Sequence, residues 1–131
     1  MGVTRRLPAS VVAALDAGKI LGIRAGREPH RFIGVWVVVV EGRVFVRSWG
    51  LKARGWHRTF LDDPHGTIEV NGRQLPVRAA LTKSERLLAA VDRAYAAKYR
   101  TPAARKYVLG FARPKRRATT TELKPERGGP A

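Results

Sequence analysis

A basic loop with two tryptophans near the middle of the chain holds the residues best suited to chemistry. Residues 47–57, RSWGLKARGWH, contain three cations, a hydroxyl, two glycines, two tryptophans and a histidine. A phosphate needs fixed cations and N–H donors, and glycine lets backbone N–H groups approach an anion. A flat heteroaromatic ring needs an apolar or aromatic wall. The segment therefore predicts a site for a flat, anionic ligand, with these candidate residues: Arg47, Ser48, Trp49, Lys52, Arg54, Trp56 and His57.

Each of these residue types also has an ordinary structural interpretation. Arg47 could point outward from a strand, and Lys52 and Arg54 could be solvated loop cations. His57 could donate a proton or contact a ring, but a histidine without an identified partner more often has a structural role. Trp36 lies within a valine-rich run and is predicted to belong to the core. All three tryptophans could supply a ligand wall, and Trp49 and Trp56, which flank the basic loop, are better placed for it than Trp36.

Other kinds of active site lack support in the sequence. There is no cysteine, and there is no glycine-rich nucleotide loop, no His-Glu-x-x-His motif and no nucleophile elbow. The adjacent Asp62 and Asp63 precede a proline, which is a common turn composition. Hydrolase, kinase and metal-site interpretations are therefore not favoured, and no metal is expected.

The net charge of +16 is the most extreme feature of the composition. Such a charge attracts polyanions, and salt weakens the attraction. The 19 arginines and seven lysines are spread over most segments, and the dense cluster is RPKRR at residues 113–117. We interpret the dispersed charge as a solvated basic surface. No apolar run reaches the roughly 20 residues of a membrane span, and we expect a cytoplasmic protein.

The elements that must position the loop are short strands and helices. Glu41-Gly42 and Asn71-Gly72 each separate two apolar runs, which predicts two tight hairpins. A capping box at residues 82–85 and the pair Thr101-Pro102 predict two helix starts, and Gly110 predicts a helix end. Pro76 predicts an edge or a bulge. The predicted strands are residues 19–25, 32–40, 44–49, 67–70, 73–80 and 117–124, and the predicted helices are residues 8–17, 54–61, 82–99 and 101–109.

This order contains no strand–helix–strand repeats, so a doubly wound parallel sheet is not expected. The predicted fold is β-rich α+β, a six-stranded antiparallel split β-barrel with short flanking helices. Residues 1–125 are predicted to form the single domain, and residues 126–131 a disordered polar tail.

The successive segments IRAGREPHRFIGVWVVVVEGRVFVRSW, GWHRTFLDDPHGTIEVNGRQLPVRA and YAAKY together resemble a bacterial domain family of unknown function. That family is similar to the flavin-binding split barrels, which include pyridoxamine-phosphate-oxidase-like proteins and deazaflavin-dependent nitroreductases. The resemblance covers roughly residues 7–125. It implies FMN or a deazaflavin as cofactor, a homodimer, and transfer of hydride or electrons to a small acceptor. It also implies that Arg47, Ser48, Lys52, Arg54, Trp56 and His57 contact the cofactor. The sequence has Thr59-Phe60-Leu61 before its Asp-Asp-Pro turn, where the deazaflavin enzymes often have Asn-Leu.

Two other functions remain open from the residues alone. The positive charge, the RPKRR cluster and exposed aromatic residues would suit a nucleic-acid-binding barrel. A barrel without a ligand, acting as a structural or interaction module, would also fit the composition.

Overall fold

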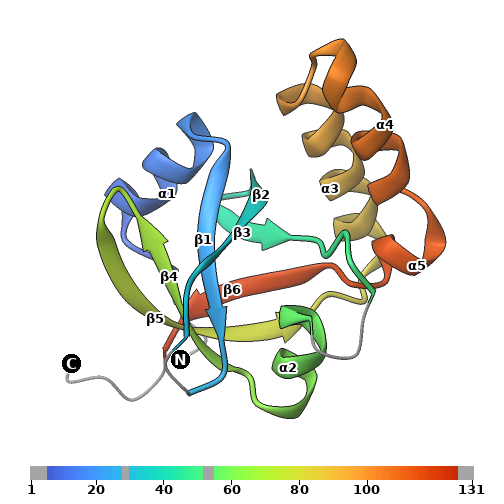
Figure 1. The fold of residues 1–131 in the computed structure, drawn as a ribbon. Coiled ribbons are helices and arrows are strands. Elements are labelled where there is room, and N and C mark those ends of the chain that lie inside the picture. The colour runs from blue at the N-terminus through green and yellow to red at the C-terminus, as the bar shows by residue number, and fades with distance from the viewer. Residues whose placement is uncertain (1–5, 28–29, 52–54, 127–131) are drawn as a thin grey trace.

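A computed structural model describes residues 6–27, 30–51 and 55–126, which form six strands and five helices (Figure 1). The strands close into one barrel in the order β1-β2-β3-β6-β5-β4, and every neighbouring pair is antiparallel. The predicted six-stranded antiparallel barrel with short flanking helices is thus confirmed. The strands are β1 (Ile20–Ala25), β2 (Ile33–Val40), β3 (Arg43–Val46), β4 (His65–Val70), β5 (Arg73–Leu81) and β6 (Thr121–Pro125).

Both predicted hairpins have the expected tight turns. Glu41 and Gly42 have φ angles of 56° and 71°, and Asn71 and Gly72 have φ angles of 51° and 78°. Positive φ at both central residues is the geometry of the hairpin turn whose twist matches that of the strands. Pro76 lies where β5 pairs with β4, just before the ladder between β5 and β6 begins at Val77.

The helices are α1 (Ala9–Ala17), α2 (Trp56–Asp62), α3 (Glu85–Lys98), α4 (Pro102–Phe111) and α5 (Pro114–Arg117). Thr101 caps α4 by accepting a hydrogen bond from the Ala104 N–H, as predicted. Several predicted helix and strand limits are wrong. β3 ends at Val46 and not at residue 49, because beyond Val46 the strand has no further pair on β2. The cap of α3 is Ser84, not a residue of a box that starts at Thr82. Gly110 lies inside α4. Residues 114–117 form α5, so the last strand begins at Thr121 and not at residue 117.

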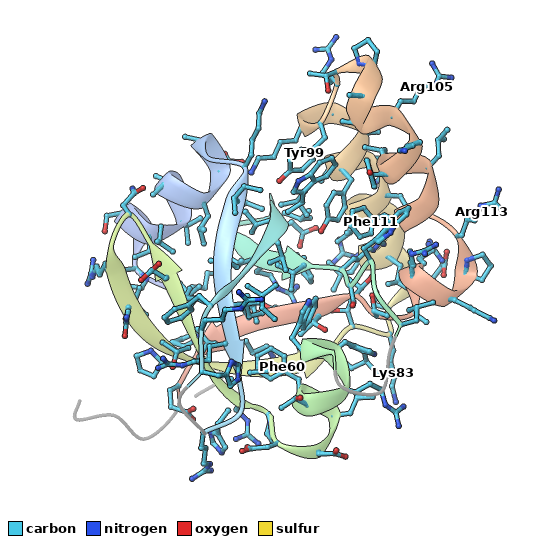
Figure 2. All side chains as sticks on the ribbon, in the orientation of Figure 1. Phe60, Lys83, Tyr99, Arg105, Phe111 and Arg113 are labelled. Atoms are coloured by element: carbon cyan, nitrogen blue, oxygen red, sulfur yellow. The ribbon has the colours of Figure 1, made fainter. Side chains whose placement is uncertain are left out.

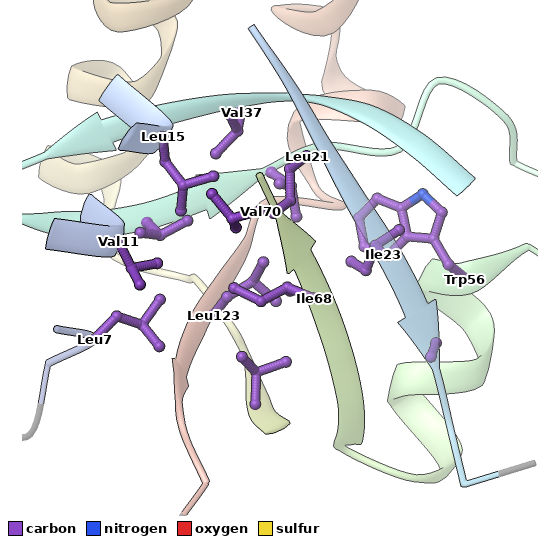
Figure 3. Packing of buried hydrophobic residues seen from close by; sticks show 14 of the residues in the cluster. Leu7, Val11, Leu15, Leu21, Ile23, Val37, Trp56, Ile68, Val70 and Leu123 are labelled. Atoms are coloured by element: carbon purple, nitrogen blue, oxygen red, sulfur yellow. The ribbon is translucent and has the colours of Figure 1, made fainter. Parts of the chain in front are cut away.

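The barrel interior is one apolar core that two helices close at opposite ends (Figure 3). Leu7 and two residues of α1 cover one end, and Trp56 and Phe60 of α2 cover the other. Alternate residues of each strand point into this core, as the pleat of a β-strand requires. The buried interior residues from the strands are Leu21, Ile23, Ala25, Val37, Val44, Val46, Ile68, Val70, Val77 and Leu123.

A second core lies between the outer face of the barrel and the α3–α4 pair (Figure 1). Val38 and Phe45 point outward from β2 and β3 and pack against residues of both helices. Trp36 belongs to the edge of this cluster and stacks on Tyr99 with ring centroids 4.3 Å apart. The helix pair therefore stands on the strands next to the predicted loop. No helix among the described residues is long and apolar enough to cross a bilayer.

Candidate functional site

The barrel opens along one edge of β2. The last pair between β2 and β3 is Val37 with Val46, whereas β2 pairs with β1 down to Ile33. The Tyr95 hydroxyl fills the point of divergence, since it donates to the Trp36 carbonyl (2.8 Å) and accepts from the Arg47 N–H (3.1 Å). On the N-terminal side of Val37, residues 33–36 of β2 pair with no strand on the β3 side within the described residues.

A pocket of about 400 Å³ lies over this open edge. Its floor is β2, and its walls come from α4 and from Trp49, which follows β3. The Trp49 ring meets Tyr107 edge-on at 4.9 Å and Phe111 edge-on at 5.5 Å, measured between ring centroids. Figure 2 shows Phe111 directed from α4 toward the barrel. The lining residues are Gly34, Val35, Trp36, Arg47, Trp49, Tyr107 and Phe111.

Two glycines make close contacts beside this pocket. A Cβ atom on Gly34, in the pocket floor, would lie 3.0 Å from Cγ2 of Ile20 on the neighbouring strand. A Cβ atom on Gly110 would lie 2.5 Å from the Trp49 ring, so the indole would have to move. The absence of a side chain at Gly110 thus lets the indole pack directly against the α4 backbone, and this contact fixes one wall of the pocket.

The pocket continues into two further hollows past Trp49. The first shares Gly34, Val35 and Trp49 with the pocket and extends to Ser48, Gly50, Gly55 and Trp56. The second begins at Gly50 and is lined by Leu51, His57, Arg58, Lys115, Ala118 and Thr119. An aromatic pocket therefore leads, along the segment after β3, to a hollow with two cations.

Trp49 lines the aromatic pocket, and its role as a ligand wall stays a prediction. Its side chain is 40% exposed, and the Arg116 guanidinium carbon lies 3.9 Å from its ring centroid. Arg116 also donates from Nε to the Trp49 carbonyl at 2.8 Å. A guanidinium at this distance makes a favourable cation–π contact, and together the two bonds hold the indole in place.

The Arg47 side chain is fully buried and bound within the protein. Its Nη1 donates to Asp92 and to the Phe111 carbonyl, and its other two nitrogens donate to the Leu88 carbonyl and to Thr120. Burial lowers the pKa of this guanidinium, and the Asp92 carboxylate opposes the shift. Because four N–H groups are taken and the side chain is closed to solvent, the geometry favours the structural interpretation of Arg47 over phosphate contact.

The other predicted residues are dispersed around the hollows. Ser48 is buried, donating its N–H to Thr119 and its hydroxyl to the Gly50 carbonyl. Trp56 belongs to the barrel core and is 8% exposed, although it also borders the middle hollow. Lys52 and Arg54 lie outside the described residues.

His57 lies at the start of α2 and lines the basic hollow. Its Nδ1 atom is buried and has no hydrogen-bond partner among the described residues. Burial lowers the pKa of the imidazole, and the nearby Arg58 charge lowers it further. The ring is therefore favoured in its neutral form, in which it can donate or accept one hydrogen bond at each nitrogen.

Sequence reasoning missed the contribution of α4 and α5 to the site. Tyr107 and Phe111 stand four residues apart, which places them on one face of a helix and was an available signal. Lys115 and Arg116 belong to the RPKRR cluster, whose position beside the loop depends on the tertiary fold. The local sequence does not identify Gly34 as a pocket residue, because a glycine in a strand can equally mark a bulge or a bend.

Comparison with known families places the chain among uncharacterized bacterial proteins. The model of the family "Uncharacterized protein conserved in bacteria (DUF2255)" matches residues 11–123. The search of curated proteins finds no match.

Two solved structures share the fold. A conserved hypothetical protein from Mycobacterium tuberculosis, Rv2991, aligns with a TM-score of 0.58 and 12% identity over 98% of this chain and 85% of its own. A FAD-binding protein from Mesorhizobium loti, mll6688, aligns with a TM-score of 0.57 and 12% identity over 97% of this chain and 95% of its own. At this identity the likeness establishes the fold alone.

Proposed function

Because the chain belongs to the DUF2255 family and shares its barrel with a FAD-binding protein, we propose that it is a flavin-binding split-barrel protein. The proposed ligand is FMN or a deazaflavin. The observation that carries this proposal is the aromatic pocket of about 400 Å³ that continues into a basic hollow.

The pocket suits a flat tricyclic ring. Its volume lies in the usual range for small-molecule sites, roughly 300–1,000 Å³. Trp49 and Tyr107 supply aromatic walls, and Gly34 and Val35 belong to the floor. In this proposal the ring occupies the space between α4 and the open edge of β2.

The basic hollow suits the phosphorylated end of the same ligand. Lys115 and Arg58 bring positive charge there, and no carboxylate is among its lining residues. The neutral His57 ring adds a hydrogen-bonding group. Lys52 and Arg54, from the segment that follows Leu51 in sequence, remain candidates for the same role.

A bound flavin would supply hydride or electron transfer to a small acceptor, and the proposed activity is oxidoreduction. The protein's residues would orient the ring and exclude water from one side of it. No lining residue need act as an acid or base, because a bound flavin would itself carry out the redox chemistry.

We also propose that a second copy of the chain covers the pocket mouth. Four large apolar side chains near the open edge are 40–59% exposed: Ile20, Ile33, Trp49 and Leu51. Exposed apolar residues that gather beside a pocket are typical of an interface. The resemblance to dimeric split barrels supports the same arrangement.

The proposed function is tested by titrating the purified protein with FMN, riboflavin and a deazaflavin cofactor at moderately high salt, following absorbance and fluorescence. Saturable binding of the phosphorylated ligands, with riboflavin much weaker, is the expected result. If none of the three binds, the proposal fails and the chain is better described as a barrel without a flavin.

A pair of variants on α4 locates the site. Tyr107→Leu removes one aromatic wall and should weaken binding roughly two- to tenfold, because a ring–ring contact contributes about 0.5–1.5 kcal/mol. Leu109→Ala, on the same helix but 59% exposed and outside the pocket, is the matched control and should bind normally. Equal affinity for all three proteins would place the ligand elsewhere.

A further inference from the structure

The helix pair carries a second basic surface that the flavin proposal does not use. Between Asp92 and Glu122 the chain has nine lysines and arginines and no carboxylate. Six of these cations are exposed, and four of the six lie on α4 or next to its two ends and are here called the α4 face: Arg100, Arg105, Lys106 and Arg113. Figure 2 shows Arg105 and Arg113 directed away from the barrel into solvent.

Charge on the α4 face is not neutralised within the described part of the chain. The carboxylates of the ion pairs bind residues outside this face. Asp63 binds Arg27, Glu122 binds Arg43, Glu41 binds Arg86, Glu85 binds Arg117, Asp92 binds both Arg47 and Arg117, and Glu126 contacts His65. No ion pair among the described residues includes a member of the α4 face. The four cations of the α4 face are therefore available to a polyanion in solution.

We propose that the α4 face binds the phosphate backbone of a nucleic acid without reading its sequence. The ten residues of α4 rise about 15 Å, and one strand of a duplex carries a phosphate about every 3.4 Å of axis, so the helix can face about four phosphates. Three of the four cations are arginines, whose planar guanidinium matches phosphate oxygens in a two-pronged contact.

The side chains around the α4 face argue against a lipid surface and against base stacking. A helix that lies on a membrane presents several large apolar residues beside its cations. Here Leu109 is the exposed large apolar residue of α4, because Phe111 is buried and Tyr107 turns toward the pocket. An open aromatic platform, on which bases of a single strand stack, is likewise missing from this described face.

The test compares two triple variants with the same charge. Arg100→Gln, Arg105→Gln and Arg113→Gln together remove three cations from the α4 face and leave the proposed flavin site intact. Arg73→Gln, Arg78→Gln and Lys83→Gln remove three exposed cations from β5 and the segment after it. Each variant lowers the net charge from +16 to +13. Circular dichroism spectra of both variants should match that of the wild-type protein, as a check that both variants fold.

Binding is measured by fluorescence anisotropy with labelled 20-nucleotide DNA, single-stranded and duplex, in two unrelated sequences and over a range of salt, with no flavin present. The wild-type protein should bind both sequences equally. The α4-face variant should lower the slope of log K against log salt by about 2 to 3, as expected for the loss of three phosphate contacts, and the β5 variant by much less.

Two results would overturn the proposal: equal loss in both variants, which would make binding a property of net charge, or no saturable binding at low salt. Sedimentation with anionic phosphatidylglycerol vesicles is run in parallel, and capture by vesicles without binding to DNA would also overturn it. Because flavin is absent, these results do not depend on the outcome of the flavin titration.

Discussion

Arg47 shows why a cation at the end of a strand need not belong to a ligand site. Its guanidinium joins α3, α4 and the segment just before β6 through Asp92, Phe111 and Thr120. Replacement by methionine keeps much of the side-chain volume but leaves buried carbonyl groups without donors. We expect Arg47→Met to lower the free energy of unfolding by about 3 kcal/mol, measured by urea denaturation. A variant of normal stability that has lost flavin affinity would instead return Arg47 to the cofactor site.

His57 gives a prediction about pH. The pKa of its ring is lowered in the folded protein by burial and by Arg58, so the folded state favours the neutral ring. The stability from this preference is complete above the unfolded pKa of about 6.5 and is lost as the pH falls toward the lower folded-state value. The free energy of unfolding should therefore fall less steeply in His57→Gln than in wild type as the pH is lowered below about 6.5. Parallel curves from urea denaturation would contradict this.

At the scale of elements, the packing of Trp49 against α4 depends on the absence of a side chain at Gly110. Alanine is a better helix former than glycine by about 1 kcal/mol, yet a Cβ atom at Gly110 would strike the Trp49 ring. Gly110→Ala should therefore destabilise the protein, change its tryptophan fluorescence and weaken flavin binding. In a Trp49→Ala background the same change should be neutral or stabilising, since the obstacle is gone. A loss of stability in both backgrounds would show that another contact requires this glycine.

The two hairpins and the end of α4 show which features could be predicted from sequence and which could not. The two hairpins depend on Glu41-Gly42 and Asn71-Gly72, whose backbone preferences are local, and both turns were predicted correctly. Gly110 carries a local signal for a helix end, but Trp49 packs against it from more than sixty residues away in sequence and the helix continues. Local sequence patterns could not predict the role of α5 in the basic hollow, because only the tertiary fold brings Lys115 and His57 to the same hollow.

At the scale of the whole molecule, the pocket has one uncovered side. Trp49 and Ile33 at its mouth are 40% and 44% exposed, while the remaining walls are supplied by the barrel and α4. A stable interface buries roughly 800 Å² from each partner, so strand edges and polar groups around the apolar rim should contribute as well. Formation of the proposed dimer should depend most on the apolar residues at the centre of the rim.

Ile33→Lys tests this arrangement. A lysine at the middle of a desolvated contact would lose its hydration without gaining a partner, so the variant should be monomeric at concentrations where wild type is dimeric. Light scattering after size exclusion, at several loading concentrations, measures the mass. Leu61→Lys, at a site on α2 that is 48% exposed and lies outside the rim, is the control and should leave the mass unchanged. A wild-type protein that is monomeric at every concentration would show that one chain forms the whole pocket, and flavin affinity would then have to come from the walls of a single barrel.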